Sequence, residues 1–302
     1  MTAQRAQSVS RLGSVQIESS RSMGTSEMSA SGRYLLGDSP AEIRHLVAQA
    51  EVYAQEATEL FDLIGVDSGS SAIDVGCGVL GVVHLLAERV GADGRVIGLD
   101  REPRMVESGR GFAEQHGLAV EFIEADATAT GLPDQSFDLV HARTLLLNVQ
   151  NPQDVLAEMV RITKPGGVVA VQEPDASAWN CDPPHPAFDI LRAAILNAYR
   201  RTGKDFNIGR RIGRMLRDTG LHDVHVRPTA RVTNTGDYYQ TFLLTVAGLV
   251  RDVIVQTGEL TGNEFDSYTA TLRAHLEAPH TITCQPVMWQ AWGRTGAVTD
   301  AH

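Results

Sequence analysis

A short glycine-rich stretch, SAIDVGCGVLG at 71–81, places the strongest constraint on how this chain can fold. Ala72 to Val75 is a short apolar run of the kind that forms a strand buried on both faces. Three glycines follow, Gly76, Gly78 and Gly81, and a sequence with helical spacing begins directly after them. Glycine allows positive φ angles and a close ligand approach, and the helix that follows offers free amides. The stretch is therefore typical of a nucleotide-binding turn.

Asp74 distinguishes this turn from a pyrophosphate-binding turn of similar spacing. The pattern G-x-G-x-x-G alone also matches the fingerprint of dinucleotide-binding proteins. Here a carboxylate precedes the first glycine by two residues, at the mouth of the strand. This charge would repel a pyrophosphate and attract a ligand that carries an ammonium and a sulfonium group. The sequence therefore favours a ligand such as S-adenosylmethionine.

Charge and cysteine content exclude several classes of function. The formal net charge is −11 and no basic stripe is present, whereas nucleic-acid phosphates require clustered Lys and Arg. The cysteines, Cys77, Cys181 and Cys284, are odd in number and far apart, which predicts neither a disulfide framework nor a metal site. No apolar run reaches membrane-spanning length, and the N-terminus lacks the apolar core of a signal peptide. We expect a cytoplasmic protein with no metal, no nucleic-acid partner and no membrane contact.

The middle of the chain alternates strands with helices. Strands are expected at 72–75, 95–99, 120–123, 137–141 and 168–171, and helices at 102–116 and 152–163. This alternation of strands and helices predicts an α/β protein with a Rossmann-like, doubly wound sheet and right-handed crossovers. The sheet is expected to be mostly parallel, with an antiparallel last strand.

The remaining chain divides by composition. Residues 1–30 are rich in serine and predict a disordered leader, and residues 31–70 predict an N-terminal helical segment with one amphipathic helix from Pro40 to Ile64. Residues 71–175 form the predicted cofactor-binding core, and residues 176–302 a helical cap with the last two strands of the sheet. The cap helices are expected at 188–201, 208–219, 237–257 and 262–278, and the strands at 224–231 and 283–292. A homo-oligomer, formed by exchange of the leader between subunits, stays one of the alternatives for the assembly state.

Five polar side chains stand at or just beyond the carboxyl ends of the expected strands. They are Asp74, Asp100, Asp126, Arg143 and Glu173. Ligands of open parallel sheets bind at this edge. The sequence therefore predicts a single binding site there.

Five motifs in register resemble those of class I S-adenosylmethionine-dependent methyltransferases. They are DVGCG at 74–78, GLD at 98–100, EADA at 124–127, FDLVHAR at 137–143 and LAEMVRITKPGG at 156–167. The chain departs from the usual first motif because Val79 and Leu80 displace the last glycine by one position. The cap and leader are similar to small-molecule methyltransferases of actinobacterial secondary metabolism, and among these to teleocidin-type enzymes that methylate an isoprenoid carbon.

The resemblance implies which residues contact the cofactor. Asp74 and the glycine backbone would hold its methionine end, Asp100 its ribose hydroxyls, and Asp126 its adenine amino group. The full set implied is Tyr34, Asp74, Gly76, Cys77, Gly78, Asp100, Arg101, Met105, Asp126, Ala127 and Arg143.

Several of these residues have a second interpretation. Cys77 is equally a small buried filler, and Met105 a plain core residue. Asp126 is alternatively a turn cap. Arg143 either borders the methionine carboxylate or forms a salt bridge with a neighbouring acid.

The candidates for a catalytic role are weaker. Glu173 and Asp175 lie where the fifth expected strand opens, and are the best-placed acids to take a proton, although the same residues suit a cap or hinge. His185 lies in a loop between two prolines. Many relatives have a histidine near position 148, where this chain has Asn148, and His141 suits a buried structural role.

Aromatic residues in the cap suggest the acceptor. Trp179, Phe188, Tyr199, Tyr238, Tyr239 and Phe242 either line an apolar pocket or pack the helices together. We expect methylation of a small, largely apolar acceptor, at carbon or alternatively at oxygen or nitrogen. An NAD(P)-dependent oxidoreductase and a non-catalytic cofactor-binding protein are the alternatives from other classes.

Overall fold

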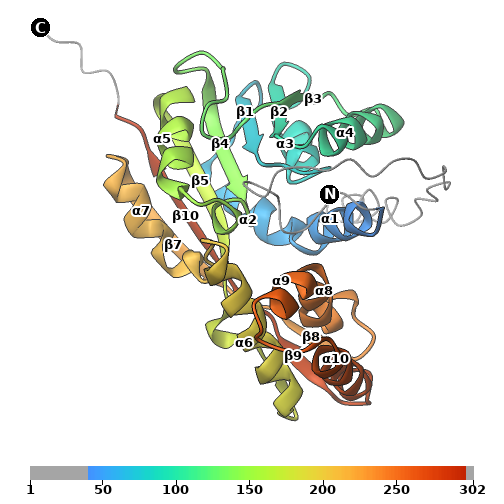
Figure 1. Ribbon diagram of the computed structural model, residues 1–302. Helices are drawn as coiled ribbons and strands as arrows, with labels where there is room; N and C mark the ends of the chain where they lie inside the picture. Colours follow the sequence, from blue (N-terminus) through green and yellow to red (C-terminus); the bar gives the residue numbers. More distant parts are fainter. Residues whose placement is uncertain (1–39, 297–302) are drawn as a thin grey trace, which may run out of the picture. The chain divides into compact units, whose positions relative to one another are not determined.

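The computed structural model describes residues 40–296, with side chains from Leu46 onward. The expected leader and Tyr34 lie outside the described residues. Seven strands form one sheet in the order β3-β2-β1-β4-β5-β10-β7 (Figure 1). These strands are β1 (Ser71–Val75), β2 (Arg95–Asp100), β3 (Glu121–Glu124), β4 (Phe137–Arg143), β5 (Thr163–Asp175), β7 (His222–Thr229) and β10 (Val287–Arg294).

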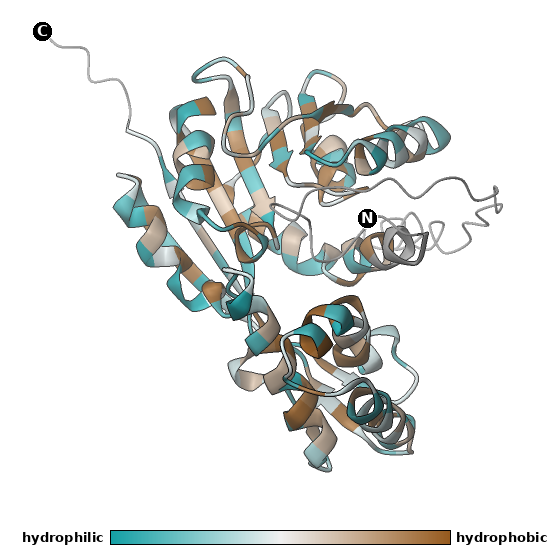
Figure 2. Cartoon of the chain, viewed as in Figure 1, coloured by the Kyte–Doolittle hydropathy of each residue, from teal (hydrophilic) through white to brown (hydrophobic). Residues whose placement is uncertain are grey.

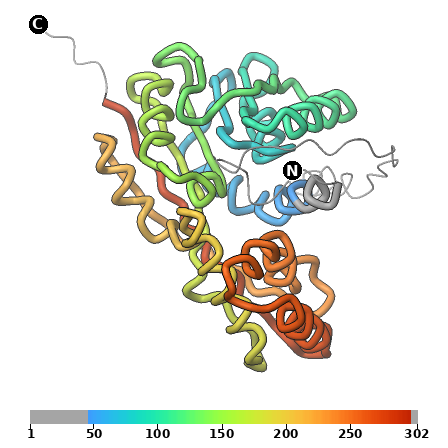
Figure 3. The backbone as a smooth tube through the Cα atoms, viewed as in Figure 1, coloured from blue at the N-terminus to red at the C-terminus, as the bar shows by residue number. Residues whose placement is uncertain are grey.

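The direction of the strands confirms the predicted fold class. The strands from β3 to β5 pair in parallel, and β10 runs antiparallel to both of its neighbours, β5 and β7. Figure 3 shows the last strand, in red, returning to lie beside the yellow-green β5. In the register of β1, Asp74 stands between Gly98 on β2 and His141 on β4. The sheet is thus Rossmann-like, doubly wound and mostly parallel.

Amphipathic helices cover the sheet. Helix α5 buries Val155, Leu156, Met159 and Ile162, a spacing that places one apolar stripe toward the strands. Figure 2 shows the corresponding concentration of apolar residues along the central strands. In the part of the chain that is described, no helix combines the length and the apolar character needed to cross a bilayer. The helices in contact with this sheet include α3 (Val83–Val90), α4 (Pro103–His116), α5 (Pro152–Ile162) and α7 (Ile212–Asp218).

The N-terminal helical segment is bent, contrary to the single helix expected over 40–64. It consists of α1 (Pro40–Val52) and α2 (Ala54–Ile64). The junction residue, Tyr53, has φ −96° and ψ 10°, outside the regular helical values. Backbone hydrogen bonds still reach across it, from Tyr53 N to the Gln49 carbonyl and from Ala57 N to the Tyr53 carbonyl. Because Tyr53 is only 5% exposed, the bend buries its ring.

Sequence reasoning overlooked a second sheet, with the order β6-β9-β8. Each of its strands has only three residues, too short for a recognisable alternation. The strand expected over 283–292 is in fact two strands, β9 and β10. We call the elements between β5 and β10, other than β7, η5 (Ile208–Arg211) and α7, the helical cap. They are η4 (Ala176–Ala178), β6 (Asn180–Asp182), α6 (Pro186–Arg201), β8 (Val232–Asn234), η6 (Tyr238–Thr241), α8 (Phe242–Leu249), α9 (Arg251–Gln256), α10 (Gly262–Leu276) and β9 (Ile282–Cys284).

Strand β5 is longer than the expected 168–171. It begins at Thr163, so the predicted KPGG turn is an irregularity within the strand: Phe137 pairs with Thr163, and Leu139 already pairs with Val168. At its other end β10 continues to pair with β5 as far as Asp175. Glu173 and Asp175 therefore lie within the paired strand and not beyond its end.

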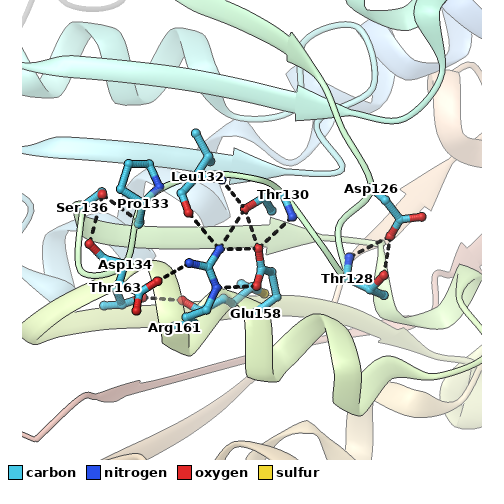
Figure 4. A network of polar contacts seen from close by, with 11 residues as sticks. Asp126, Thr128, Thr130, Leu132, Pro133, Asp134, Ser136, Glu158, Arg161 and Thr163 are labelled. Carbon is cyan, nitrogen blue, oxygen red and sulfur yellow. Dashed lines mark hydrogen bonds and ion pairs between the residues drawn. The ribbon is translucent and has the colours of Figure 1, made fainter.

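Arg161 on α5 anchors the connection between β3 and β4 (Figure 4). Its Nε and Nη2 each donate to a Glu158 carboxylate oxygen at 2.7 Å, and Nη2 also donates to the Leu132 carbonyl at 2.9 Å. Arg161 also pairs with Asp134, and Glu158 accepts the Thr130 amide at 2.7 Å. The connection that carries Asp126 is thereby tied to the helix. These hydrogen bonds to Arg161 lower the pKa of Glu158 to about 2.

We expect Glu158→Gln to destabilise the protein most at neutral pH. Because the folded-state pKa lies below the ordinary value of 4.5, the stabilisation is complete above that value and is lost as the pH falls through about 2. Hydrogen bonds to charged groups contribute about 1.5–3 kcal/mol. Urea denaturation at pH 7 and pH 3.5 measures the effect, with Glu114→Gln, at an exposed position of α4, as control. An equal loss at both pH values would contradict the assignment.

Candidate functional site

The glycine turn is built around the buried carboxylate of Asp74, which is 1% exposed. Its Oδ2 accepts the Val82 amide at 2.9 Å, and its Oδ1 lies 2.8 Å from His141 Nδ1. A Cβ on Gly81 would stand 2.0 Å from Asp74 Oδ2, so only glycine fits there. Gly76 and Gly78 also have positive φ angles, of 70° and 57°. The turn thus wraps its backbone around one carboxylate.

A chain of buried hydrogen bonds leads from Asp74 across the sheet. Gln290 Nε2 donates to the Glu56 carbonyl and to Gln172 Oε1, both at 2.9 Å. Gln172 Nε2 then lies 2.8 Å from His141 Nε2. Since a backbone carbonyl only accepts, the orientation of both amides is fixed, and His141 Nδ1 carries the proton donated to Asp74. His141 is therefore a structural histidine, as one interpretation of the sequence expected.

Asp100 closes the other side of the turn. Its Oδ2 accepts the Gly78 amide at 2.8 Å and its Oδ1 accepts the Glu102 amide at 3.0 Å. Burial raises the pKa of Asp100, and the two amides oppose this rise. Each carboxylate oxygen retains a second lone pair, so Asp100 can still accept hydrogen bonds from a ligand.

A cavity lies at the carboxyl ends of β1, β2 and β4. Apart from Tyr34, every cofactor contact implied by the sequence lines it. They are Asp74, Gly76, Cys77, Gly78, Asp100, Arg101, Met105, Asp126, Ala127 and Arg143. Asp126 Oδ1 caps a turn by accepting the Thr128 amide at 2.8 Å, and Met105 is buried, as their second interpretations expected; their contacts with a cofactor stay predictions.

Arg143 is a buried cation in the wall of this cavity. Its Nη2 donates to the Gly81 carbonyl at 3.0 Å, and its Nη1 is buried with no hydrogen-bond partner among the described residues. None of the ion pairs within residues 40–296 includes Arg143. A buried guanidinium is costly unless an acceptor meets it. Arg143 therefore fits a ligand carboxylate.

A second cavity adjoins the first. Leu46, Gln49, Thr144 and Asn148 line both. Its other walls come from α1–α2, the helical cap and the sheet, and no charged side chain of the described residues lines it. The remaining lining residues are Tyr53, Leu147, Pro174, Tyr199, Phe206, Phe242, Val246, Leu249, Pro286 and Met288.

The expected catalytic acids do not line either cavity. Glu173 is fully buried, and it accepts the amides of Leu145, Leu146 and Leu147 at 3.0, 2.7 and 3.3 Å. Asp175 is likewise buried; it pairs with Arg210 and accepts the Ser177 amide. Both carboxylates hold loops in place, so their geometry does not support proton transfer to an acceptor.

His185 is the helix cap of α6, because its Nδ1 accepts the Ala187 amide at 3.2 Å. It too lies outside both cavities. Sequence reasoning did not select Gln49, Tyr53 or Thr144, which line the cavities instead. Tyr53 could have been identified from the sequence, because it is an aromatic residue among the mostly small side chains of the apolar stripe expected in the N-terminal helix.

We expect Gly81→Ala to cost about 3–5 kcal/mol of unfolding free energy, because it adds left-handed strain to the loss of buried hydrogen bonds to Asp74. Gly117→Ala is the matched control: its φ is 63°, and nothing lies within 4 Å of an added Cβ. That variant should lose about 1–2 kcal/mol. Urea denaturation measures both, and equal losses would contradict the role of Gly81.

The titration of Glu173 gives a further prediction. Burial raises its pKa to about 8, although the three amides oppose the rise. The folded protein then retains a proton that the unfolded chain loses above 4.5, so the unfolding free energy falls as pH increases from about 4.5 to 8. Relative to Glu173→Gln, the wild type should lose about 1.4 kcal/mol per pH unit in this window. Parallel pH profiles in denaturation experiments would exclude a buried, protonated Glu173.

Comparisons with known proteins agree with this geometry. Residues 66–201 match the family model of a methyltransferase domain. An uncharacterised 37.1 kDa protein in transposon Tn4556 of Streptomyces fradiae is 31% identical, over 67% of this chain and 58% of that protein. Phosphoethanolamine N-methyltransferase of Triticum aestivum is 31% identical, over 55% of this chain and 30% of that protein. The chain thus spans less than two thirds of the length of these relatives.

A demethylmenaquinone methyltransferase of Geobacillus kaustophilus is 32% identical, over 55% of this chain and 76% of that protein. Among solved structures, the YcgJ protein of Bacillus subtilis aligns with a TM-score of 0.53 at 16% identity, over 80% of this chain and all of that chain. Phosphoethanolamine N-methyltransferase 2 of Haemonchus contortus, in complex with S-adenosylhomocysteine, aligns with a TM-score of 0.52 at 16% identity. The alignment covers 84% of this chain and 57% of that chain. The chain belongs to the family of S-adenosylmethionine-dependent methyltransferases.

Proposed function

We propose that this protein transfers a methyl group from S-adenosylmethionine to a small, uncharged, largely apolar acceptor. The observation that carries the proposal is the pair of adjoining cavities. Acids and Arg143 line the first, whereas the second has no charged lining residue in the described chain. Four residues form walls of both, so a donor and an acceptor bound in the two cavities would meet there.

The residues of the first cavity suit this cofactor. The unpartnered Nη1 of Arg143 would receive the methionine carboxylate, and Gly76 and Gly78 hold the backbone of the turn against the cavity with positive φ angles. Asp100 would accept the ribose hydroxyls and Asp126, through its second oxygen, the adenine amino group. When bound, the cofactor supplies a methyl group already activated on a sulfonium. The protein then acts mainly by alignment, which contributes roughly 7–11 kcal/mol in well-oriented reactions.

The second cavity favours an apolar acceptor. Tyr199 and Phe242 of the expected aromatic cluster line it, together with Phe206. Trp179 packs against this group, because its ring stacks on that of Phe206 with 5.5 Å between the ring centroids. Tyr238, in contrast, is 60% exposed and is not among the lining residues. Tyr199 and Phe242 of the helical cap thus form part of an aromatic wall, which supports the proposal that the helical cap covers the acceptor.

The relatives differ in the acceptors that their names state. A phosphate, as in phosphoethanolamine, would require cationic partners, and no Lys or Arg of the described chain lines the second cavity. An uncharged acceptor suits these walls better. Methylation of an isoprenoid carbon remains a prediction, for which aromatic faces would stabilise a developing cation by about 0.5–2 kcal/mol each. Methylation at oxygen or nitrogen remains the alternative, and mass spectrometry after incubation with uncharged aromatic acceptors, followed by mapping of the methyl group, decides between them.

The proposal predicts how two variants bind two ligands. Arg143→Met should weaken S-adenosylhomocysteine roughly 10–100-fold while leaving 5′-methylthioadenosine, which lacks the carboxylate, unchanged. Asp100→Ala should weaken both ligands by similar factors, because both contain the ribose. Asp93→Ala, at an exposed position before β2, is the control. Calorimetry measures the affinities of the wild type, the two variants and the control for both ligands; a wild type that binds neither ligand would refute the proposed function.

A further inference from the structure

Asn148 holds an unusual position in η3 (Leu146–Asn148), the short helix after β4. It lines both cavities and is only 9% exposed. Its Nδ2 donates to the Thr144 carbonyl at 2.9 Å. Because a carbonyl only accepts, this hydrogen bond fixes the orientation of the amide and makes the other atom the oxygen.

The Oδ1 of Asn148 is buried and has no hydrogen-bond partner among the described residues. Buried polar atoms in folded proteins almost always have a partner, and an orphaned acceptor costs free energy until a donor reaches it. Asn148 belongs to the wall where the two cavities meet. A ligand spanning that wall is the natural source of the missing donor.

The other polar side chains that line the second cavity, Gln49, Tyr53, Thr144 and Tyr199, supply neither a charge nor a base. Burial raises the pKa of Tyr53 to about 12 and also raises that of Tyr199, so both hydroxyls stay protonated at neutral pH. No Asp, Glu or His of the described chain lines this cavity. Its walls therefore offer no titratable base, and they disfavour an anionic acceptor, whose charge would be buried without a partner.

We infer that Asn148 Oδ1 selects acceptors that carry an uncharged O–H or N–H donor on an aromatic or otherwise apolar body. This inference rests on the proposed function and deepens it, because it names the polar group that the acceptor must present. Asn148 acts by orienting the acceptor at the shared wall. An amide oxygen is too weak a base to remove a proton, so Asn148 is a specificity-determining residue.

The test uses three naphthalenes of similar shape as probes, with the protein saturated by S-adenosylhomocysteine. 2-Naphthol carries a donor, 2-methoxynaphthalene only an acceptor, and 2-methylnaphthalene neither. Without a hydrogen bond, the more apolar methyl compound should bind best, because it loses least on leaving water. We expect 2-naphthol to bind at least fivefold more tightly than either of the others. Equal binding, or no binding of any probe, would overturn the inference.

Two variants test whether Asn148 is the residue that causes the preference for 2-naphthol. Asn148→Leu should abolish the preference for 2-naphthol while leaving the affinity for 2-methylnaphthalene within about twofold. Gln150→Leu is the matched control, since Gln150 is exposed in the same loop and lines neither cavity. If Asn148→Leu still preferred 2-naphthol, the hydroxyl of that probe would donate its hydrogen bond to an atom other than Asn148 Oδ1, and the inference would be wrong. Calorimetric titration with S-adenosylhomocysteine is performed first: its failure refutes the proposed function, whereas a missing probe preference after successful binding refutes only the role of Asn148.

Discussion

The carboxylate of Asp74 is the constraint on which the site depends. It is buried at the end of a central strand, where an ionised group is tolerated only if hydrogen bonds replace the lost water. The Val82 amide and the His141 imidazole supply these bonds, and Gly81 is the residue whose missing side chain leaves room for them. The conformation of the glycine turn therefore follows from satisfying one charge. A turn held in this way is prepared for its ligand before the ligand binds.

The hydrogen bonds that begin at Asp74 also connect the two cavities mechanically. They pass through His141, Gln172 and Gln290 to the Glu56 carbonyl on α2, so they cross four strands and end on the N-terminal helical segment. That segment carries Gln49 and Tyr53, which line the second cavity. Both ends of the chain of bonds are acceptors, and this fixes the direction of every donor between them. The glycine turn and the N-terminal helical segment are thus joined by one continuous series of buried hydrogen bonds.

Local patterns predicted which residues line the first cavity, because parallel strands bring their carboxyl ends together wherever the chain goes between them. To predict where Asp74, Asp100 and Asp126 lie, it was enough to know where the expected strands end. The catalytic candidates failed for the opposite reason. Glu173 and Asp175 were placed at an open strand end, but β10, more than a hundred residues later, pairs with β5 past both of them. The wall of the second cavity combines α1, η3, α8 and β10, an arrangement that depends on packing and leaves no periodic signal.

The separation of charge between the two cavities has a consequence for selectivity. If the second cavity receives the acceptor, as we propose, a charged group entering it would lose its hydration without gaining a counter-charge, at a cost of several kcal/mol. Apolar contacts alone discriminate weakly, since one methylene is worth only about 1–3 kcal/mol. A single buried acceptor such as Asn148 Oδ1 discriminates more strongly, because a ligand without a donor leaves it unpaired. An apolar cavity with one orphaned polar atom can therefore be tolerant of the acceptor's shape and selective for one hydrogen-bonding group.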